Sequence, residues 1–175
     1  MWTPATNNFV GQELWKSDGS ESGTLIVKDI NTGNSSSKIS NITNINGHLY
    51  FIATDFVNGY GIWKSDGLDS GTIILKSINN NINNLTPTTF LNINSEIYFI
   101  ANDSTNGSEL WKSDGTSLGT YIVKDINIGS VGSAPGNLTE LNDTLFFTAY
   151  NNIYGRELWK SDGTSAGTSS IKVID

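Results

Sequence analysis

Aspartate and tryptophan side chains recur along the sequence at one fixed spacing, and together they could bind a ligand. The indoles are Trp15, Trp63, Trp111 and Trp159, at intervals of 48 residues. An aspartate and a glycine follow each indole at the third and fourth positions, as Asp18-Gly19, Asp66-Gly67, Asp114-Gly115 and Asp162-Gly163. Carboxylate oxygens are ligands that Ca²⁺ prefers, and an indole offers a broad apolar face for stacking. This pattern admits one calcium-dependent, lectin-like site in each copy.

The same residues also have a structural interpretation, which the sequence favours. Asp and Ser side chains accept backbone N–H bonds inside turns, and glycine permits a positive φ. A calcium loop of the EF type has oxygen ligands at alternate positions and a terminal Glu. Here each turn has a single fixed aspartate, with an added acid only at Glu21 and Asp69. We therefore predict a structural repeat motif with no metal ligands, and we leave calcium binding as the alternative.

The sequence has no set of residues that stands apart from the repeat and could catalyse a reaction. A catalytic site normally breaks the symmetry of a repeat, because one copy carries groups that the others lack. The singletons of note are His48 and Arg156. The absence of cysteine excludes disulfides, thiolate metal sites and a cysteine nucleophile. We predict that the chain is not an enzyme and has no catalytic residues and no cofactor.

Lysines also recur at equivalent positions. One set follows the indoles directly, at Lys16, Lys64, Lys112 and Lys160, and a second set lies in the next apolar segment, at Lys28, Lys76, Lys124 and Lys172. For the first set we expect ion pairs with acids such as Glu13, Glu109 and Glu157, or alkyl stems that cover an aromatic face. Both interpretations are structural.

Charge and hydropathy exclude two classes of partner. The net charge is −7 with ten Lys and Arg residues, whereas a nucleic-acid surface needs a basic face. No apolar run approaches the ~18 residues of a spanning helix. Met1 leads directly into Trp2-Thr3-Pro4, so we expect no signal peptide in this sequence. Neither nucleic acid nor membrane insertion is predicted.

The elements that must position the repeated residues are short β-strands. The chain has 18 Gly and 3 Pro residues, and β-branched and aromatic residues are plentiful. In the second copy the pattern predicts four strands, at 42–45, 48–54, 61–65 and 72–78, followed by a polar link at 79–87. A loop at 55–59 joins the second and third strands, and Asn46-Gly47 suits a two-residue hairpin turn. Strand 48–54 is apolar on both faces and should be buried on both.

Four-stranded meanders in tandem are typical of a β-propeller. We predict a single all-β repeat domain over 1–175, with a partial blade at 1–30 and blades at 31–78, 79–126 and 127–175. The first blade lacks its innermost strand, and a β-trefoil is the alternative fold. An incomplete ring exposes strand edges and apolar faces. We therefore expect either self-association, as a homodimer that completes a larger ring, or a longer parent chain.

The repeat resembles a known family. The segment Glu109-Leu110-Trp111-Lys112-Ser113-Asp114-Gly115-Thr116, followed by Gly119-Thr120, is similar to the ELWxxDGT repeat, and similar copies cover essentially the whole chain. Gly61-Ile62 replaces Glu-Leu in the second copy. The resemblance implies a bacterial surface or secreted protein in an extracellular setting, and it implies no defined activity.

The copies differ most in two sets of loops, which are the candidate interaction surface. The inter-blade links are 31–38, 79–86 and 127–136, and the shorter loops are 55–60, 103–108 and 151–156. Both sets should emerge at the same face of the blades, and variable loops on a repeated scaffold commonly carry binding. We predict a non-enzymatic binding or structural module that presents these loops to a protein or a glycan.

Overall fold

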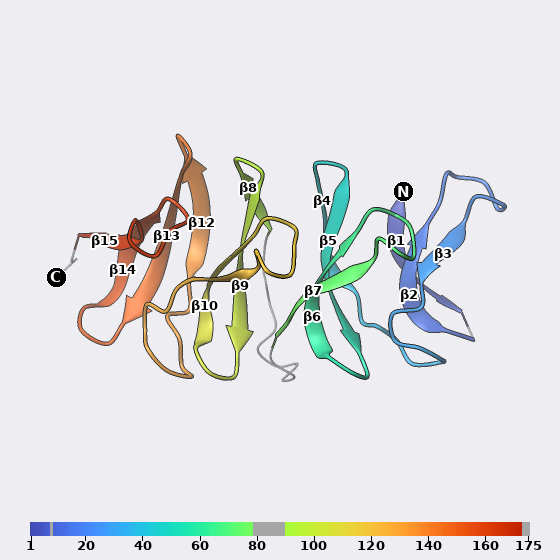
Figure 1. Cartoon of the computed structure of the whole chain (residues 1–175), viewed down its shortest axis with the longest axis horizontal. Coiled ribbons are helices and arrows are strands. Elements are labelled where there is room, and N and C mark those ends of the chain that lie inside the picture. The colour runs from blue at the N-terminus through green and yellow to red at the C-terminus, as the bar shows by residue number, and fades with distance from the viewer. Residues whose placement is uncertain (8, 79–89, 173–175) are drawn as a thin grey trace. The chain divides into compact units, whose positions relative to one another are not determined.

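The computed structural model describes residues 1–7, 9–78 and 90–172, which form fifteen strands and no helix in these ranges (Figure 1). The strands are β1 (Trp2–Asn7), β2 (Gly11–Lys16), β3 (Leu25–Lys28), β4 (Ser40–Ile45), β5 (His48–Asp55), β6 (Gly59–Ser65), β7 (Ile73–Ser77), β8 (Leu91–Ile93), β9 (Glu96–Asp103), β10 (Gly107–Ser113), β11 (Tyr121–Lys124), β12 (Gly136–Leu141), β13 (Thr144–Asn151), β14 (Gly155–Ser161) and β15 (Ser169–Lys172). The predicted loop at 55–59 is shorter than expected, because both of its ends pair in the ladder. The predicted link at 79–87 lies outside the described residues.

Each copy of the repeat forms one antiparallel meander. Sheet A is β1–β3, sheet B is β4–β7, sheet C is β8–β11 and sheet D is β12–β15, with neighbouring strands paired in sequence order. Sheet A has three strands and no counterpart of β4, β8 or β12, the strands predicted from the sequence to be innermost, so the prediction that the first blade lacks this strand is confirmed. Four meanders in tandem leave no place for the twelve-stranded trefoil alternative.

The hairpin turns between the first two strands of a blade adopt one geometry despite different sequences. Asn46 and Gly47 both have positive φ, at 51° and 81°, as the Asn-Gly step predicts. Asn94-Ser95 and Asn142-Asp143 have the same sign at both positions although neither contains glycine. The ladder on either side holds these residues in the left-handed region.

The chain divides into two compact units, residues 1–82 and 83–175. Unit 1 contains sheets A and B, and unit 2 contains sheets C and D. The core of unit 1 joins Leu14 and Val27 of sheet A to Leu49, Phe51 and Trp63 of sheet B. The core of unit 2 is built from the residues 96 positions later, namely Leu110, Val123, Leu145, Phe147 and Trp159. The two units therefore use one and the same contact between consecutive sheets.

The second strand of sheet B is buried on both faces, as its sequence predicts. Leu49 and Phe51 on one face and Tyr50 and Ile52 on the other are all at most 5% exposed. Their register against β6 places Phe51 opposite Trp63 and Tyr50 opposite Lys64.

The central aromatic residue of each core should carry much of the stability of its unit. Replacing Phe147, which is 1% exposed, with alanine removes a ring that stacks on Trp159 at 6.5 Å between centroids. We expect Phe147→Ala to lower the free energy of unfolding of unit 2 by about 3–5 kcal/mol, measured by chemical denaturation. Leu118→Ala, at a residue that is 97% exposed, is the control and should leave the unfolding midpoint unchanged.

Candidate functional site

The Ser-Asp-Gly turn of every copy is closed by the same pair of hydroxyl groups, which is buried in every copy but the first. Ser113 and Thr120 lie 2.7 Å apart between their oxygens, the Gly115 N–H donates to Ser113 at 3.0 Å, and Thr120 donates to the carbonyl of Thr116. The other copies repeat this arrangement at Ser17–Thr24, Ser65–Thr72 and Ser161–Thr168. The Ser and Thr of the motif therefore serve the turn itself.

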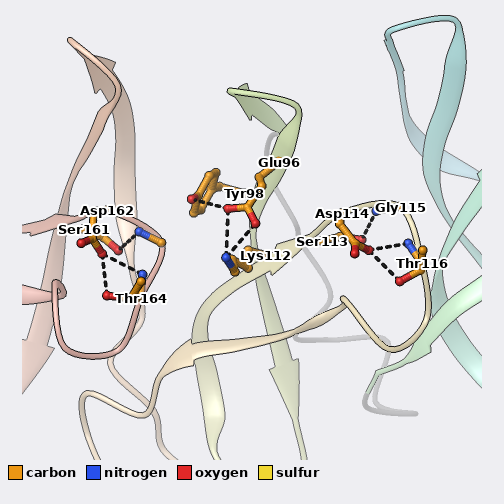
Figure 2. Close-up of polar contacts among 11 residues, drawn as sticks. Glu96, Tyr98, Lys112, Ser113, Asp114, Gly115, Thr116, Ser161, Asp162 and Thr164 are labelled. Carbon is orange, nitrogen blue, oxygen red and sulfur yellow. Dashed lines mark hydrogen bonds and ion pairs between the residues drawn. The ribbon is translucent and has the colours of Figure 1, made fainter.

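The recurrent aspartate is also bound within its own turn. Asp162 Oδ1 accepts the backbone N–H of Thr164 at 2.8 Å and its hydroxyl at 2.7 Å, and Asp114 does the same with Thr116 (Figure 2). The hydrogen bonds from Thr164 hold the pKa of the Asp162 carboxyl below its usual value. Asp66 keeps only the backbone bond, because Leu68 in that turn has no hydroxyl.

The second glycine of the turn lies so close to this carboxylate that no larger residue fits at its position. A Cβ atom added at Gly119 would lie 2.0 Å from Asp114 Oδ1, and the equivalent glycines Gly23, Gly71 and Gly167 are as close to their own aspartates. A side chain here would displace the acceptor on which the turn depends. Within the described ranges, no three His, Cys, Asp or Glu side chains come together as a metal site.

Three of the four recurrent indoles are buried and so present no stacking surface. Trp111 is 2% exposed, donates its Nε1–H to the carbonyl of Ala101 at 3.1 Å and stacks on Phe99. Trp63 and Trp159 are 4% and 7% exposed. Trp15 is half-buried. The geometry favours the packing interpretation of these tryptophans over a platform for sugars.

Lys16 and Lys112 bind partners other than the glutamates that the sequence offered for them. Lys112 contacts both oxygens of Glu96 at 2.8 and 2.9 Å (Figure 2). Lys16 donates to the carbonyl of Gly67, in the turn of the next sheet, at 2.9 Å. Lys112 also lies over an aromatic face, but it does so with its ammonium group, whose Nζ is 5.4 Å from the centre of the Tyr121 ring.

The glutamate before each Leu-Trp pair has a role that sequence reasoning missed. Glu13 is fully buried and accepts the backbone N–H groups of Ile30 at 2.8 Å and Ser37 at 3.1 Å. These two residues lie at the two ends of the link from sheet A to sheet B. One carboxylate thus binds both ends of the link that follows its own blade.

We call this arrangement the glutamate clamp. Unit 2 has the same arrangement at Glu109, which is also fully buried. Its carboxylate accepts the Ser133 N–H at 2.8 Å, the Ser133 hydroxyl at 2.5 Å and the Asn127 N–H at 3.4 Å. Burial raises the pKa of the Glu109 carboxyl to about 7, because desolvation outweighs these hydrogen bonds. The pKa of Glu13 is raised for the same reason. The sequence shows that Glu13 and Glu109 are equally spaced from the links that follow them, but this spacing does not reveal their backbone partners.

Gly61 stands where the second copy would have this glutamate, so that position supplies no carboxylate. A Cβ atom there would lie 2.5 Å from Ile74 Cδ1, which fills the space. The link that follows this copy lies outside the described residues. The division between the two compact units falls in that same link, between Ile82 and Asn83.

The two sets of variable loops meet at one end of the strands in each unit, as predicted. In unit 1 the link residue Ser37 donates to the carbonyl of Gln12, beside the β1–β2 loop, and accepts from Thr54, beside the β5–β6 loop. In unit 2 Ser133 contacts Ser108 and Tyr150 in the same way. The Ser-Asp-Gly turns lie at the opposite ends of these strands.

Each short loop has a fixed base and an exposed tip. Asp55 accepts the N–H groups of Val57 and Asn58 at the base of the β5–β6 loop, and Asn151 does so for Ile153 and Tyr154 in sheet D. The tips expose large apolar side chains, namely Phe9 (82%), Phe56 (73%), Val57 (90%), Ile153 (79%) and Tyr154 (52%). The link of unit 2 adds Ile128 (86%) and Val131 (79%).

The two singletons and two hollows complete the list of candidate sites. Arg156 joins its loop to the link of unit 2 by donating to the carbonyl of Ala134 at 3.0 Å. His48 lies half-buried at the start of β5, opposite Ile45. Hollows of about 370 and 360 Å³ flank the first and last turns, and their linings include Lys16 and Asp18 in one and Lys160 and Asp162 in the other.

Comparisons with known proteins identify the fold. No family model matches the chain, and no curated protein matches it. A solved structure from a study of two prolyl endopeptidases aligns with 94% of this chain and 23% of its own length, at 11% identity and a TM-score of 0.52. The fold class is an all-β propeller of four-stranded antiparallel blades. That likeness, at 11% identity, concerns the fold alone.

Two further solved structures are similar at lower scores, which carry no argument here. Prolyl oligopeptidase B from Galerina marginata aligns with 97% of this chain and 24% of its own, at 15% identity and a TM-score of 0.41. An α-L-arabinofuranosidase from Clostridium thermocellum aligns with 99% and 72%, at 12% identity and a TM-score of 0.37. The chain thus spans about a quarter of the first two proteins. None of the residues that the structure describes forms a helix able to cross a membrane.

The aspartate of the turn should matter for stability and not for metal binding. Asp162→Ala removes both bonds from Thr164 and should lower the melting temperature, whereas Asp162→Asn keeps the Oδ1 acceptor and should restore most of it. Adding calcium should leave the melting temperature of the wild-type protein unchanged. A rise with calcium that Asp162→Ala abolishes would favour the lectin-like alternative.

The buried Glu109 should give unit 2 a pH dependence of a definite sign. Its pKa is about 7 in the folded protein against an ordinary value of 4.5, so the folded state binds the extra proton between these two values. Stability from this group is therefore largest below about pH 4.5 and falls as pH rises to 7, by at most about 1.4 kcal/mol per pH unit. Glu109→Gln should reduce this slope in denaturation curves. Glu21→Gln, at an exposed turn, is the control and should leave the slope intact.

Proposed function

We propose that the chain is a non-enzymatic binding and structural repeat module of a bacterial surface or secreted protein, and that it presents its variable loops to a protein or glycan ligand. The observation that carries this proposal is the use made of the repeated polar side chains. Those of the Ser-Asp-Gly-Thr turns hydrogen-bond within their own turns, and Glu13 and Glu109 bind the links. Because these groups build the scaffold, recognition falls to the segments that differ between blades.

The loop tips support this role by their exposure and chemistry. They carry aromatic and aliphatic side chains at an end of the blades where two loop sets converge. Aromatic residues are enriched in binding hot spots, because they bury a large area at a small entropic cost. Phe56, Ile153 and Tyr154 have these properties, and hydrogen bonds at the base of each loop hold them in place.

The proposed setting rests on the resemblance of the repeat to the ELWxxDGT family. The absence of cysteine and the net charge of −7 fit a protein outside the cell as well as one inside it. The enzymes among the structural neighbours share the fold at low identity and add no catalytic residues to this chain. A test of the proposed function therefore also has to include an assay for peptidase and glycosidase activity.

Binding should depend on the loop tips and not on the turns at the opposite end. We expect the wild-type protein to bind members of a glycan array, or an extracellular matrix protein panel, and the variant Ile153→Ser/Tyr154→Ser to lose at least about tenfold in affinity. Leu118→Ser, at an exposed residue of a turn, is the matched control and should bind as the wild type does.

Two results would contradict this function. One is binding that Leu118→Ser abolishes and the loop variant leaves intact. The other is turnover of a prolyl peptide or an arabinoside that a single substitution abolishes while the protein remains folded.

A further inference from the structure

Sheet D exposes the face that its predecessor, sheet C, buries. Sheet C packs Ile93, Tyr98, Leu110 and Val123 into the core of unit 2, where they are 6%, 4%, 0% and 3% exposed. The residues 48 positions later in sheet D are Leu141, Phe146, Leu158 and Ile171. Leu141 is 59% exposed, Leu158 39% and Ile171 45%, and Phe146 is half-buried. These residues form the D face, an apolar surface that matches the one sheet C uses to pack on sheet D.

Sheet A presents the complementary face. Sheet B receives sheet A on Leu49, Phe51, Ala53 and Trp63. The residues 48 positions earlier in sheet A are Met1, Thr3, Ala5 and Trp15, which we call the A face. Met1 is 83% exposed and the other three are half-buried, so this face is open. Thr3 stands where the other sheets have phenylalanine.

The turn glycines mark the point where one sheet contacts the next. A Cβ atom at Gly67 would lie 2.2 Å from Cη2 of Trp2, because that indole of sheet A rests on the turn of sheet B. At Gly163 it would lie 2.2 Å from the hydroxyl of Tyr98, a residue of sheet C. At Gly19 it would meet nothing within 4 Å. The space beside Gly19 is therefore open, whereas an aromatic ring occupies the equivalent space beside Gly67 and Gly163.

Sheet D carries an aromatic ring that would fit in the space beside Gly19. Phe146 occupies the position of Trp2 and Tyr98 in its own sheet, opposite Lys160 in the ladder. Trp2 is opposite Lys16 in the same way, and the Lys16 ammonium donates to the carbonyl of Gly67. Lys160 is exposed and can make the equivalent bond to the carbonyl of Gly19. Sheet D thus has both the aromatic ring and the lysine that this contact needs, at Phe146 and Lys160.

We propose that two copies of the chain associate head to tail, with the D face of each docked on the A face of the other. The apolar part of the contact is the same one that joins sheet A to sheet B and sheet C to sheet D. Two copies bring together eight sheets, which lies within the range of known propellers. A head-to-tail contact repeats until the assembly closes, and closure at two copies leaves no A face or D face exposed. The inference is independent of the proposed function, because the loop tips take no part in the contact.

Mass in solution is the first test. The 18.9 kDa chain should sediment with twice that mass, and Phe146→Asp should sediment as a monomer because it places a charge in the apolar contact. Val57→Asp, the same change at a loop residue that is 90% exposed, should remain a dimer. Thermal unfolding of Phe146→Asp confirms that the monomer is folded. A wild-type monomer at high concentration, or a dimer that Phe146→Asp leaves intact, would overturn the proposal.

Cross-linking is the second test, and it reports the direction of docking. The chain has no cysteine, so single cysteines introduced at two sites are unique reporters. Phe146→Cys and Ser20→Cys proteins, mixed and treated with a short bifunctional thiol reagent, should cross-link to each other and not to themselves. Leu68 occupies the position of Ser20 in sheet B, so the turn tolerates this change. Cross-linking of Phe146→Cys with itself would show a face-to-face contact and contradict head-to-tail docking.

Discussion

Each compact unit depends on one carboxylate that is buried where the chain passes from one blade to the next. Glu13 and Glu109 bind backbone N–H groups at both ends of their links. A buried carboxylate is costly unless it is well hydrogen-bonded, and a backbone amide inside a link also needs a partner. The two requirements satisfy each other here. Because the link is fixed at both ends, the next sheet starts at a set place, and Phe51 or Phe147 meets the preceding sheet in the same way each time.

This arrangement separates the residues that build the fold from those that are free to vary. The turn with its Ser–Thr pair, the aspartate acceptor and the nearby glycine form a closed hydrogen-bonded unit at one end of the strands. The links and short loops gather at the other end, where only their bases are constrained. A repeat of this kind can change its tips without changing its blades. The A face and the D face remain exposed in a single chain, because each sheet carries the residues with which the other sheets pack on a neighbour.

Much of the fold could be predicted because the residues that determine it recur at a fixed spacing. The 48-residue spacing predicted the meanders, and Asn46-Gly47 predicted a turn with two positive φ values, which the structure confirms. The structural role of the buried indoles followed from their recurrence. The glutamate clamp could not be predicted, because its partners are backbone N–H groups that no side-chain pattern reveals. The lysine pairing failed for a related reason, since Lys16 reaches a carbonyl in the next sheet rather than an acid nearby.

Hydrogen exchange at the ends of the links tests the central claim most directly. The amide of Ile30 lies at the start of a link, yet it donates to the buried carboxylate of Glu13. We predict that it exchanges as slowly as the amides of strand β2, which carries Glu13, and that Glu13→Ala speeds its exchange while the β2 amides stay protected. Exchange of the Ile30 amide at the rate of an exposed loop, or protection that survives Glu13→Ala, would contradict the account.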